Sequence, residues 1–151
     1  MQVTFHWVRV QMFCYATERK ELLGETMAEL LGTDEFDVDI SESEHGNTML
    51  IMSSRLTKQK EFTALFTKLG KDVLESIEAD IENRIDDDCV FYVRLDKQKA
   101  VQGQYSVAHH GDVISITGKV QSHPARKEVA VRNMLEFLNS LPHSDSVSSS
   151  D

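Results

Sequence analysis

The sequence has little of what marks specialised classes of protein. Two cysteines, Cys14 and Cys89, among 151 residues are too few for a disulfide scaffold and fit a reducing compartment. The longest stretches without a charged residue, His45–Ser54 and Ala100–Gly111, fall well short of the roughly 20 residues that span a bilayer. Residues 1–9 lack the basic and apolar regions of a secretory signal. These absences predict a soluble, cytoplasmic protein.

Motifs for nucleotide, metal or hydrolytic chemistry are also missing. The sequence has no P-loop, GxGxxG, GxSxG, HExxH or CxxC pattern. Asp86, Asp87 and Asp88 are adjacent, so they more simply end a helix than converge on magnesium. The pair His109-His110 has no cysteine partner at zinc-finger spacing, which favours a solvent-exposed pair. We therefore predict no metal site, no cofactor and no enzymatic activity, and both thiols are expected to be buried and inert.

The remaining composition is that of a globular protein. Hydrophobic residues make up 40% of the chain and charged residues 27%. We predict one domain over residues 3–141 and a disordered Ser/Asp-rich tail over 142–151. Apolar residues alternate, as in strands, over 3–15, 36–41, 49–56, 89–95 and 112–120. They recur at helical spacing over 17–31, 57–70, 71–85 and 125–141, with a short helical turn over 96–102.

This order of elements predicts an α+β fold. We expect a mostly antiparallel, or mixed, sheet of about five strands with helices packed on one face, in two layers. Thr17, Thr57 and Asp96 are the expected helix caps, and His45-Gly46-Asn47 is expected to turn a hairpin. The second face of the sheet would be partly open, which suits a binding surface better than a deep cleft. Trp7 or Tyr15 could stack a base there, although core packing is the commoner fate of an isolated aromatic residue.

Charge is unevenly distributed along the chain. The net charge is -9, and residues 34–44 and 72–88 are strongly acidic. By contrast, residues 55–71 hold five bases against one acid, and residues 89–132 hold seven against three. The bases form two groups, each at a predicted junction between a strand and a helix, with an extension near the last strand. These candidate phosphate contacts are Arg55, Lys58 and Lys60; Arg94, Lys97 and Lys99; and Lys119, Arg126 and Lys127.

Residues 84–98, RIDDDCVFYVRLDKQ, resemble the characteristic segment of a small archaeal family of RNA-binding proteins and predicted exosome subunits. Residues 10–18, 45–47, 112–114 and 123–128 support the resemblance, which covers about residues 3–141. It implies a fold similar to the large-subunit ribosomal protein that binds the smallest ribosomal RNA. It also implies RNA binding without catalysis. Two positions depart from the family: members often have glycine where Cys89 stands and commonly proline at Thr48.

Two hypotheses follow. The first is a non-catalytic RNA-binding accessory protein that contacts phosphates through a local basic face. The resemblance implies the archaeal exosome, or ribosome-associated proteins, as its protein partners. The second is a protein–protein adaptor that docks through an acidic helix over residues 72–88. The two are distinguished by whether the basic groups converge in space; if they scatter, the adaptor gains support. A magnesium nuclease would require Asp86–Asp88 and Asp96 to face one cavity.

Overall fold

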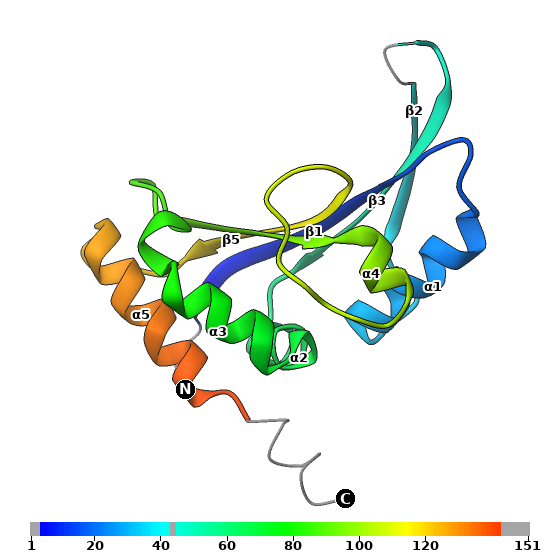
Figure 1. Ribbon diagram of the computed structural model, residues 1–151. Helices are drawn as coiled ribbons and strands as arrows, with labels where there is room; N and C mark the ends of the chain where they lie inside the picture. Colours follow the sequence, from blue (N-terminus) through cyan, green and yellow to red (C-terminus); the bar gives the residue numbers. More distant parts are fainter. Residues whose placement is uncertain (1–3, 43–44, 143–151) are drawn as a thin grey trace, which may run out of the picture.

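The computed structural model describes residues 4–42 and 45–142 (Figure 1). The strands are β1 (Phe5–Cys14), β2 (Asp37–Glu42), β3 (Thr48–Leu56), β4 (Val90–Asp96) and β5 (Val113–Val120). The helices are α1 (Lys20–Leu31), α2 (Gln59–Leu69), α3 (Lys71–Ala79), α4 (Lys97–Val101) and α5 (Lys127–Ser140), with a 3-10 turn, η1 (Ile81–Asn83). The sheet order is β2-β3-β1-β5-β4, and every neighbouring pair is antiparallel. The predicted α+β fold is confirmed.

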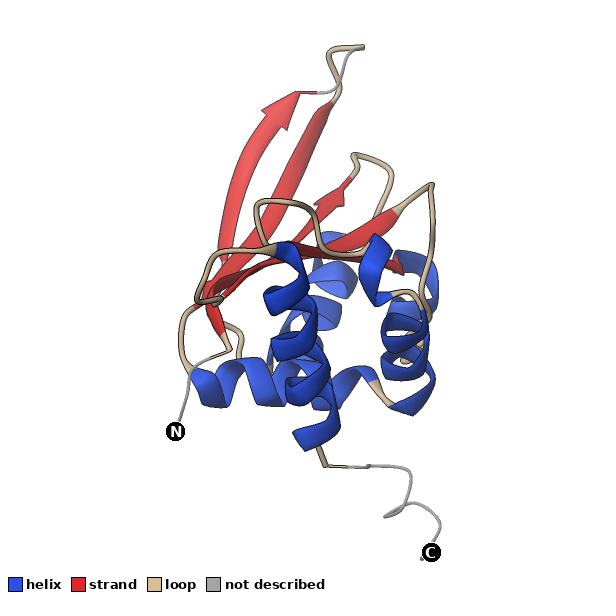
Figure 2. Cartoon of the chain, turned by 90° about the vertical axis from the view of Figure 1, so that its left-hand side faces the viewer, coloured by secondary structure: helices blue, strands red, loops and turns tan. Residues whose placement is uncertain are grey.

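The helices lie on one side of the sheet, as Figure 2 shows. Residues that alternate along each strand explain this arrangement. Val10 of β1 pairs with Ile116 of β5, which pairs with Val93 of β4, and all three are buried. Since successive side chains point to opposite faces, the residues between them lie on the face without helices. The predicted two-layer arrangement is therefore confirmed, with one open face.

Phenylalanines fill the core between the two layers. Phe5 of β1 packs against Phe62 and Phe66 of α2 and Phe137 of α5, with ring centroids 5.2, 5.7 and 5.7 Å away. Gly118 of β5 makes room for this packing, because a Cβ atom there would lie 2.9 Å from the Phe5 ring. Burying each such ring stabilises the fold by about 2–3 kcal/mol. The core thus fixes β1 and β5 side by side at the centre of the sheet.

Two predicted helix caps are wrong. α1 begins at Lys20 rather than at Thr17, because residues 15–18 form a turn in which the Glu18 N–H donates to the Tyr15 carbonyl at 2.9 Å. α2 begins after Lys58, whose N–H donates to a Glu61 carboxylate oxygen at 3.1 Å. A carboxylate in the first helical turn therefore replaces the hydroxyl expected from residue 57.

The predicted helix over 71–85 is also too long. α3 ends at Ala79, and Asp80 accepts a hydrogen bond from the Asn83 amide at 2.6 Å in the turn that follows. Ile85 then forms an isolated β-bridge with Phe91, so this part of the backbone pairs with the edge of β4. The acidic segment 72–88 is consequently a short helix, a 3-10 turn and an extended piece, not one helix.

β2 and β3 form the predicted hairpin, with Glu42 paired to Thr48. In Figure 1 the far ends of these strands extend beyond the helical layer. Val38 and Ile40 of β2 are therefore 43% and 78% exposed, where the sequence predicted a half-buried strand. Within the described residues, no helix is long and apolar enough to cross a membrane. The tail predicted over 142–151 falls, except for its first residue, outside the described residues.

Candidate nucleic-acid interface

The open face of the sheet brings together side chains from four strands. The register pairs Arg55 of β3 with Arg9 of β1, Arg9 with Thr117 of β5, and Thr117 with Tyr92 of β4. Arg94 follows Tyr92 by two residues and so lies on the same face. Three arginines and a tyrosine, drawn from distant parts of the sequence, thus share one surface.

This surface is positively charged within an acidic protein. Its cations are Arg9, Arg55, Arg94 and Lys119, the first three of them exposed. β1, β3 and β5 contain no aspartate or glutamate. The acid of β4, Asp96, is the N-cap of α4, where its carboxylate accepts an N–H at 2.9 Å. Acidic residues border this face on the edge strand β2, where Asp37 and Asp39 lie opposite Ser53 and Ile51 of β3. The attraction for anions is therefore local to the four cations.

Main-chain carbonyls, rather than carboxylates, hold two of these cations. Arg94 Nη1 donates to the His109 carbonyl at 3.5 Å, and Lys119 Nζ donates to the Asp88 carbonyl at 2.5 Å. A carbonyl orients a cation without neutralising it. The charge of Lys119 is nevertheless partly offset by Asp86, whose pKa it helps to lower.

A hollow of about 370 Å³ lies on this face above β5. The side chains of β5 in its floor are small, whereas those of the flanking strands are large. Because neighbouring strands are about 4.8 Å apart, β1 and β4 stand about 10 Å apart across it. Its floor is formed by Ser115 and Thr117, one wall by Trp7, Arg9 and Gln11, and the other by Tyr92 and Arg94.

The two aromatic side chains that line the hollow are held by residues outside it. The Arg55 guanidinium lies 5.5 Å from the Trp7 ring centroid, a cation–π contact. On the opposite wall, the Tyr92 hydroxyl donates to Asp86 Oδ2 at 3.1 Å. Each ring is therefore positioned before any ligand binds.

Asp86 belongs to a tight turn rather than to a metal site. Its Oδ1 accepts the N–H groups of Asp88 and Val90 at 2.9 and 3.0 Å. Burial alone would raise the pKa of Asp86, but these hydrogen bonds and the one from Tyr92 lower it. No group of three or more histidine, cysteine or acidic residues in the described part of the chain could hold a metal ion.

A second hollow, of about 340 Å³, lies at the outer edge of β4. The flanking segments pair with that edge: the Tyr92 N–H donates to the Arg84 carbonyl, and the Ala108 N–H donates to the Arg94 carbonyl, both at 2.8 Å. Arg84 lines this hollow, and its Nε is buried with no hydrogen-bond partner among the described residues. Tyr92 and Arg94 line both hollows, which makes them neighbours on one surface.

The structure separates the nine predicted phosphate contacts. Arg55, Arg94 and Lys119 lie on the open face. The others lie on or next to helices: Lys58 and Lys60 at the start of α2, Lys97 and Lys99 on α4, Arg126 and Lys127 at the start of α5. β3 and β4 run in opposite directions, so the two predicted junctions lie at opposite ends of the sheet. The junctions do not converge, although their strand residues share a face.

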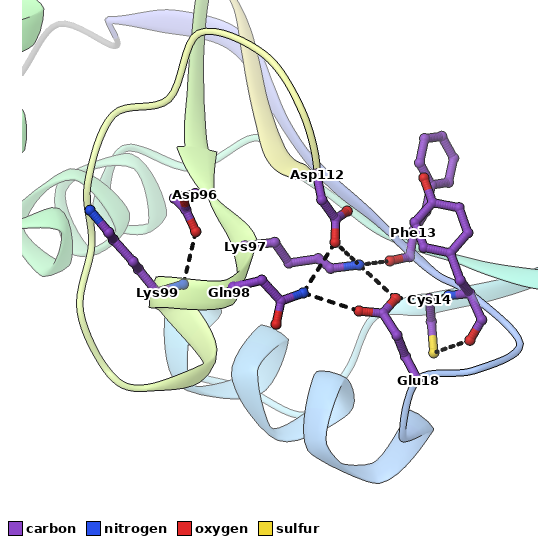
Figure 3. Close-up of polar contacts among 9 residues, drawn as sticks. Phe13, Cys14, Glu18, Asp96, Lys97, Gln98, Lys99 and Asp112 are labelled. Carbon is purple, nitrogen blue, oxygen red and sulfur yellow. Dashed lines mark hydrogen bonds and ion pairs between the residues drawn. The ribbon is translucent and has the colours of Figure 1, made fainter.

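Lys97 must be removed from the predicted phosphate contacts. Its side chain is 0% exposed. Figure 3 shows its Nζ between the Phe13 carbonyl, Glu18 Oε1 and Asp112 Oδ2, at 2.6, 2.8 and 3.0 Å. An ammonium group has three protons, and all three are used here. Gln98 Nε2 bridges the same two carboxylates at 3.3 and 3.2 Å.

Sequence reasoning missed Arg9, Gln11 and Tyr92. Arg9 and Gln11 alternate with the buried residues of β1, so the period of the strand placed them on the second face. Arg9 was overlooked because it belongs to neither basic segment of the chain. Trp7, proposed as a stacking residue, does line the hollow, whereas Tyr15 lies beyond the end of β1.

Comparisons with known proteins identify the family of this chain. A family model described as RNA binding matches residues 7–120. The chain belongs to this RNA-binding family. The RNA-binding protein PAB1135 of Pyrococcus abyssi is 29% identical over 143 residues, which cover 88% of this chain and 93% of that protein.

Two solved structures are similar to this chain in fold as well as in sequence. Mth689, a DUF54 protein from Methanothermobacter thermautotrophicus, is 28% identical with a TM-score of 0.75, covering 89% of this chain and 98% of its own. AF2318 from Archaeoglobus fulgidus is 30% identical with a TM-score of 0.74, covering 88% and 99%. The relatives are archaeal, and none of these three is named as an enzyme.

Proposed function

We propose that this protein binds RNA, without catalysis, through the open face of its sheet. The observation that carries the proposal is the group of Arg9, Arg55 and Arg94, which are exposed on one face of β1, β3 and β4. Phosphate contacts dominate the affinity of proteins for nucleic acid, so a local basic surface can bind RNA even on an acidic protein.

The other predicted phosphate contacts are secondary in this proposal. Lys119 borders the open face, while Lys58, Lys60 and Lys99 are exposed on helices that follow strand ends. They would meet RNA where it leaves the sheet. Arg126 and Lys127 start α5 in the helical layer and are the least favoured of the set.

A salt titration tests the proposal. Each phosphate contact with a single strand contributes about −0.7 to the slope of log K against log salt. Replacing both Arg9→Gln and Arg94→Gln should therefore weaken binding and reduce the slope by about 1.4 between 0.1 and 0.5 M salt.

The matched control is Arg132→Gln, which removes the same charge from an exposed position on α5. It should leave affinity and slope unchanged. A control that behaves like the double variant would show only a general charge effect. Unchanged RNA binding by the double variant would contradict the open face as the binding surface.

A second proposal keeps the adaptor role and the exosome association implied by the sequence. Its support is that Asp72, Glu75 and Glu78 are all exposed on α3, in the layer opposite the open face, so a basic protein and RNA could bind together. Capture of exosome subunits by the wild-type protein, lost in a Glu75→Lys/Glu78→Lys variant that still binds RNA, would support it. Equal capture by both would count against it.

A further inference from the structure

The hollow above β5 has the shape and lining of a site for one flat aromatic group. Its volume, about 370 Å³, is at the small end of the roughly 300–1,000 Å³ typical of small-molecule sites. Aromatic rings stand on both sides of it, Trp7 from β1 and Tyr92 from β4. A planar group that enters would meet an aromatic side chain on either wall and small residues beneath.

The polar lining suits a nucleobase with its phosphate attached. Gln11, Ser115 and Thr117 offer one amide and two hydroxyls that can donate to or accept from base edges. Arg9 and Arg94 stand in opposite walls, where a phosphate of the same strand would be neutralised. The hollow thus combines stacking, hydrogen bonding and positive charge within one nucleotide's reach.

We infer that this hollow binds an unpaired nucleotide base, so that the protein recognises single-stranded segments of RNA rather than duplex. The inference rests on the proposed function and names its substrate class. Bases within an A-form duplex are stacked on their neighbours and cannot enter a hollow on a protein surface, whereas unpaired bases can stack on aromatic side chains.

The second hollow supports a path for the next nucleotide. It shares Tyr92 and Arg94 with the first, and Arg84 lines it with a buried Nε that has no partner among the described residues. Asp80 lines this hollow as well and pairs with Arg84 at 3.8 Å, so a phosphate there would be held chiefly by Arg94. The strand would then run across β4 toward the edge of the sheet.

The chain has one tryptophan, Trp7, so its fluorescence reports directly on the hollow. We expect a single-stranded RNA octamer to quench it and to bind at least tenfold more tightly than the blunt duplex of the same sequence. Tyr92→Ala should weaken octamer binding about tenfold or more, as loss of one base–aromatic stack does, and leave duplex binding unchanged.

Two variants separate stacking from structural damage. Tyr92→Phe keeps the ring but loses the hydrogen bond to Asp86, and it should bind the octamer nearly as well as the wild type. Ile40→Ala removes an exposed apolar side chain outside the hollow and should have no effect. Equal affinity for octamer and duplex with Tyr92→Ala unaffected would overturn the inference while the salt-dependent RNA binding still stood. Absence of RNA binding by the wild type at 0.1 M salt, as well as at lower salt, would instead overturn the proposed function too.

Discussion

Cys89 occupies a backbone conformation that favours glycine. Its φ is 65°, and among the described residues it is the sole non-glycine residue with a positive φ. The left-handed region costs an L-residue about 1–2 kcal/mol because Cβ crowds the following carbonyl oxygen. Cys89 closes the turn that begins at Asp86, to whose carbonyl its N–H donates at 3.0 Å. The turn therefore favours glycine at this position.

We expect Cys89→Gly to change the free energy of unfolding by less than about 1 kcal/mol, because relief of the strained φ offsets the loss of a buried thiol. Cys89→Val should destabilise the protein by about 2 kcal/mol, since a β-branched residue fits poorly at positive φ. Urea unfolding of the two variants measures both changes. Equal destabilisation by glycine and valine would show that burial, not backbone conformation, determines which residue is favoured at position 89.

Three elements meet at the buried ammonium of Lys97. The Phe13 carbonyl comes from β1, Glu18 from the turn before α1, and Asp112 from the loop before β5. The Tyr15 ring lies 5.0 Å from Nζ. This cluster holds the loop over 102–112 against the end of β1, and the same loop supplies the carbonyl that orients Arg94. A lysine in a basic run is thus part of the scaffold of the open face.

Lys97→Met should destabilise the fold by about 3 kcal/mol, because it leaves two partly buried carboxylates without their cation. Lys99→Met, two residues away and exposed, should change stability by less than about 0.5 kcal/mol. Thermal and urea unfolding of the pair measure the difference. Similar stability of the two variants would mean that Gln98 alone compensates for the lost ion pairs.

The same cluster makes stability depend on pH through Glu18. Burial would raise the pKa of Glu18, but the hydrogen bond and charge of Lys97 and the Tyr15 N–H lower it below its ordinary 4.5. A lowered pKa means that the stabilisation is complete above about pH 4.5 and is lost as the pH falls through the folded-state value. Glu18→Gln should therefore be less stable than the wild type at pH 7, with a gap that narrows at pH 3. A difference in stability between the two proteins that does not change with pH would exclude this dependence on Glu18.

At the scale of the molecule, the fold was predictable and the site only in part. Alternation in 3–15 and 112–120, and helical spacing in 125–141, were strong enough to give the α+β class and the single helical layer. The order of the strands could not be predicted, because the pairing of β1 with both β3 and β5 depends on contacts between residues distant in sequence. The binding face depends on that order: Arg9, Arg55 and Tyr92 meet only through it. From the charges along the sequence, Lys97 and Arg94 were equally good candidates for phosphate contact. A count of charges shows neither burial nor ion pairing.

If RNA binds the open face as proposed, the uneven distribution of charge over the molecule governs its approach. At 0.01 M salt charges act over about 30 Å, farther than the thickness of the sheet, so RNA would sense the whole charge of -9. At 0.15 M they act over about 8 Å, and an approaching strand senses only the face nearest to it. Moderate salt thus screens the repulsion from the acidic side of the protein, while the exposed arginines still attract a strand close to them. In the proposed function, the distribution of charge thus orients the protein, with its open face toward the RNA.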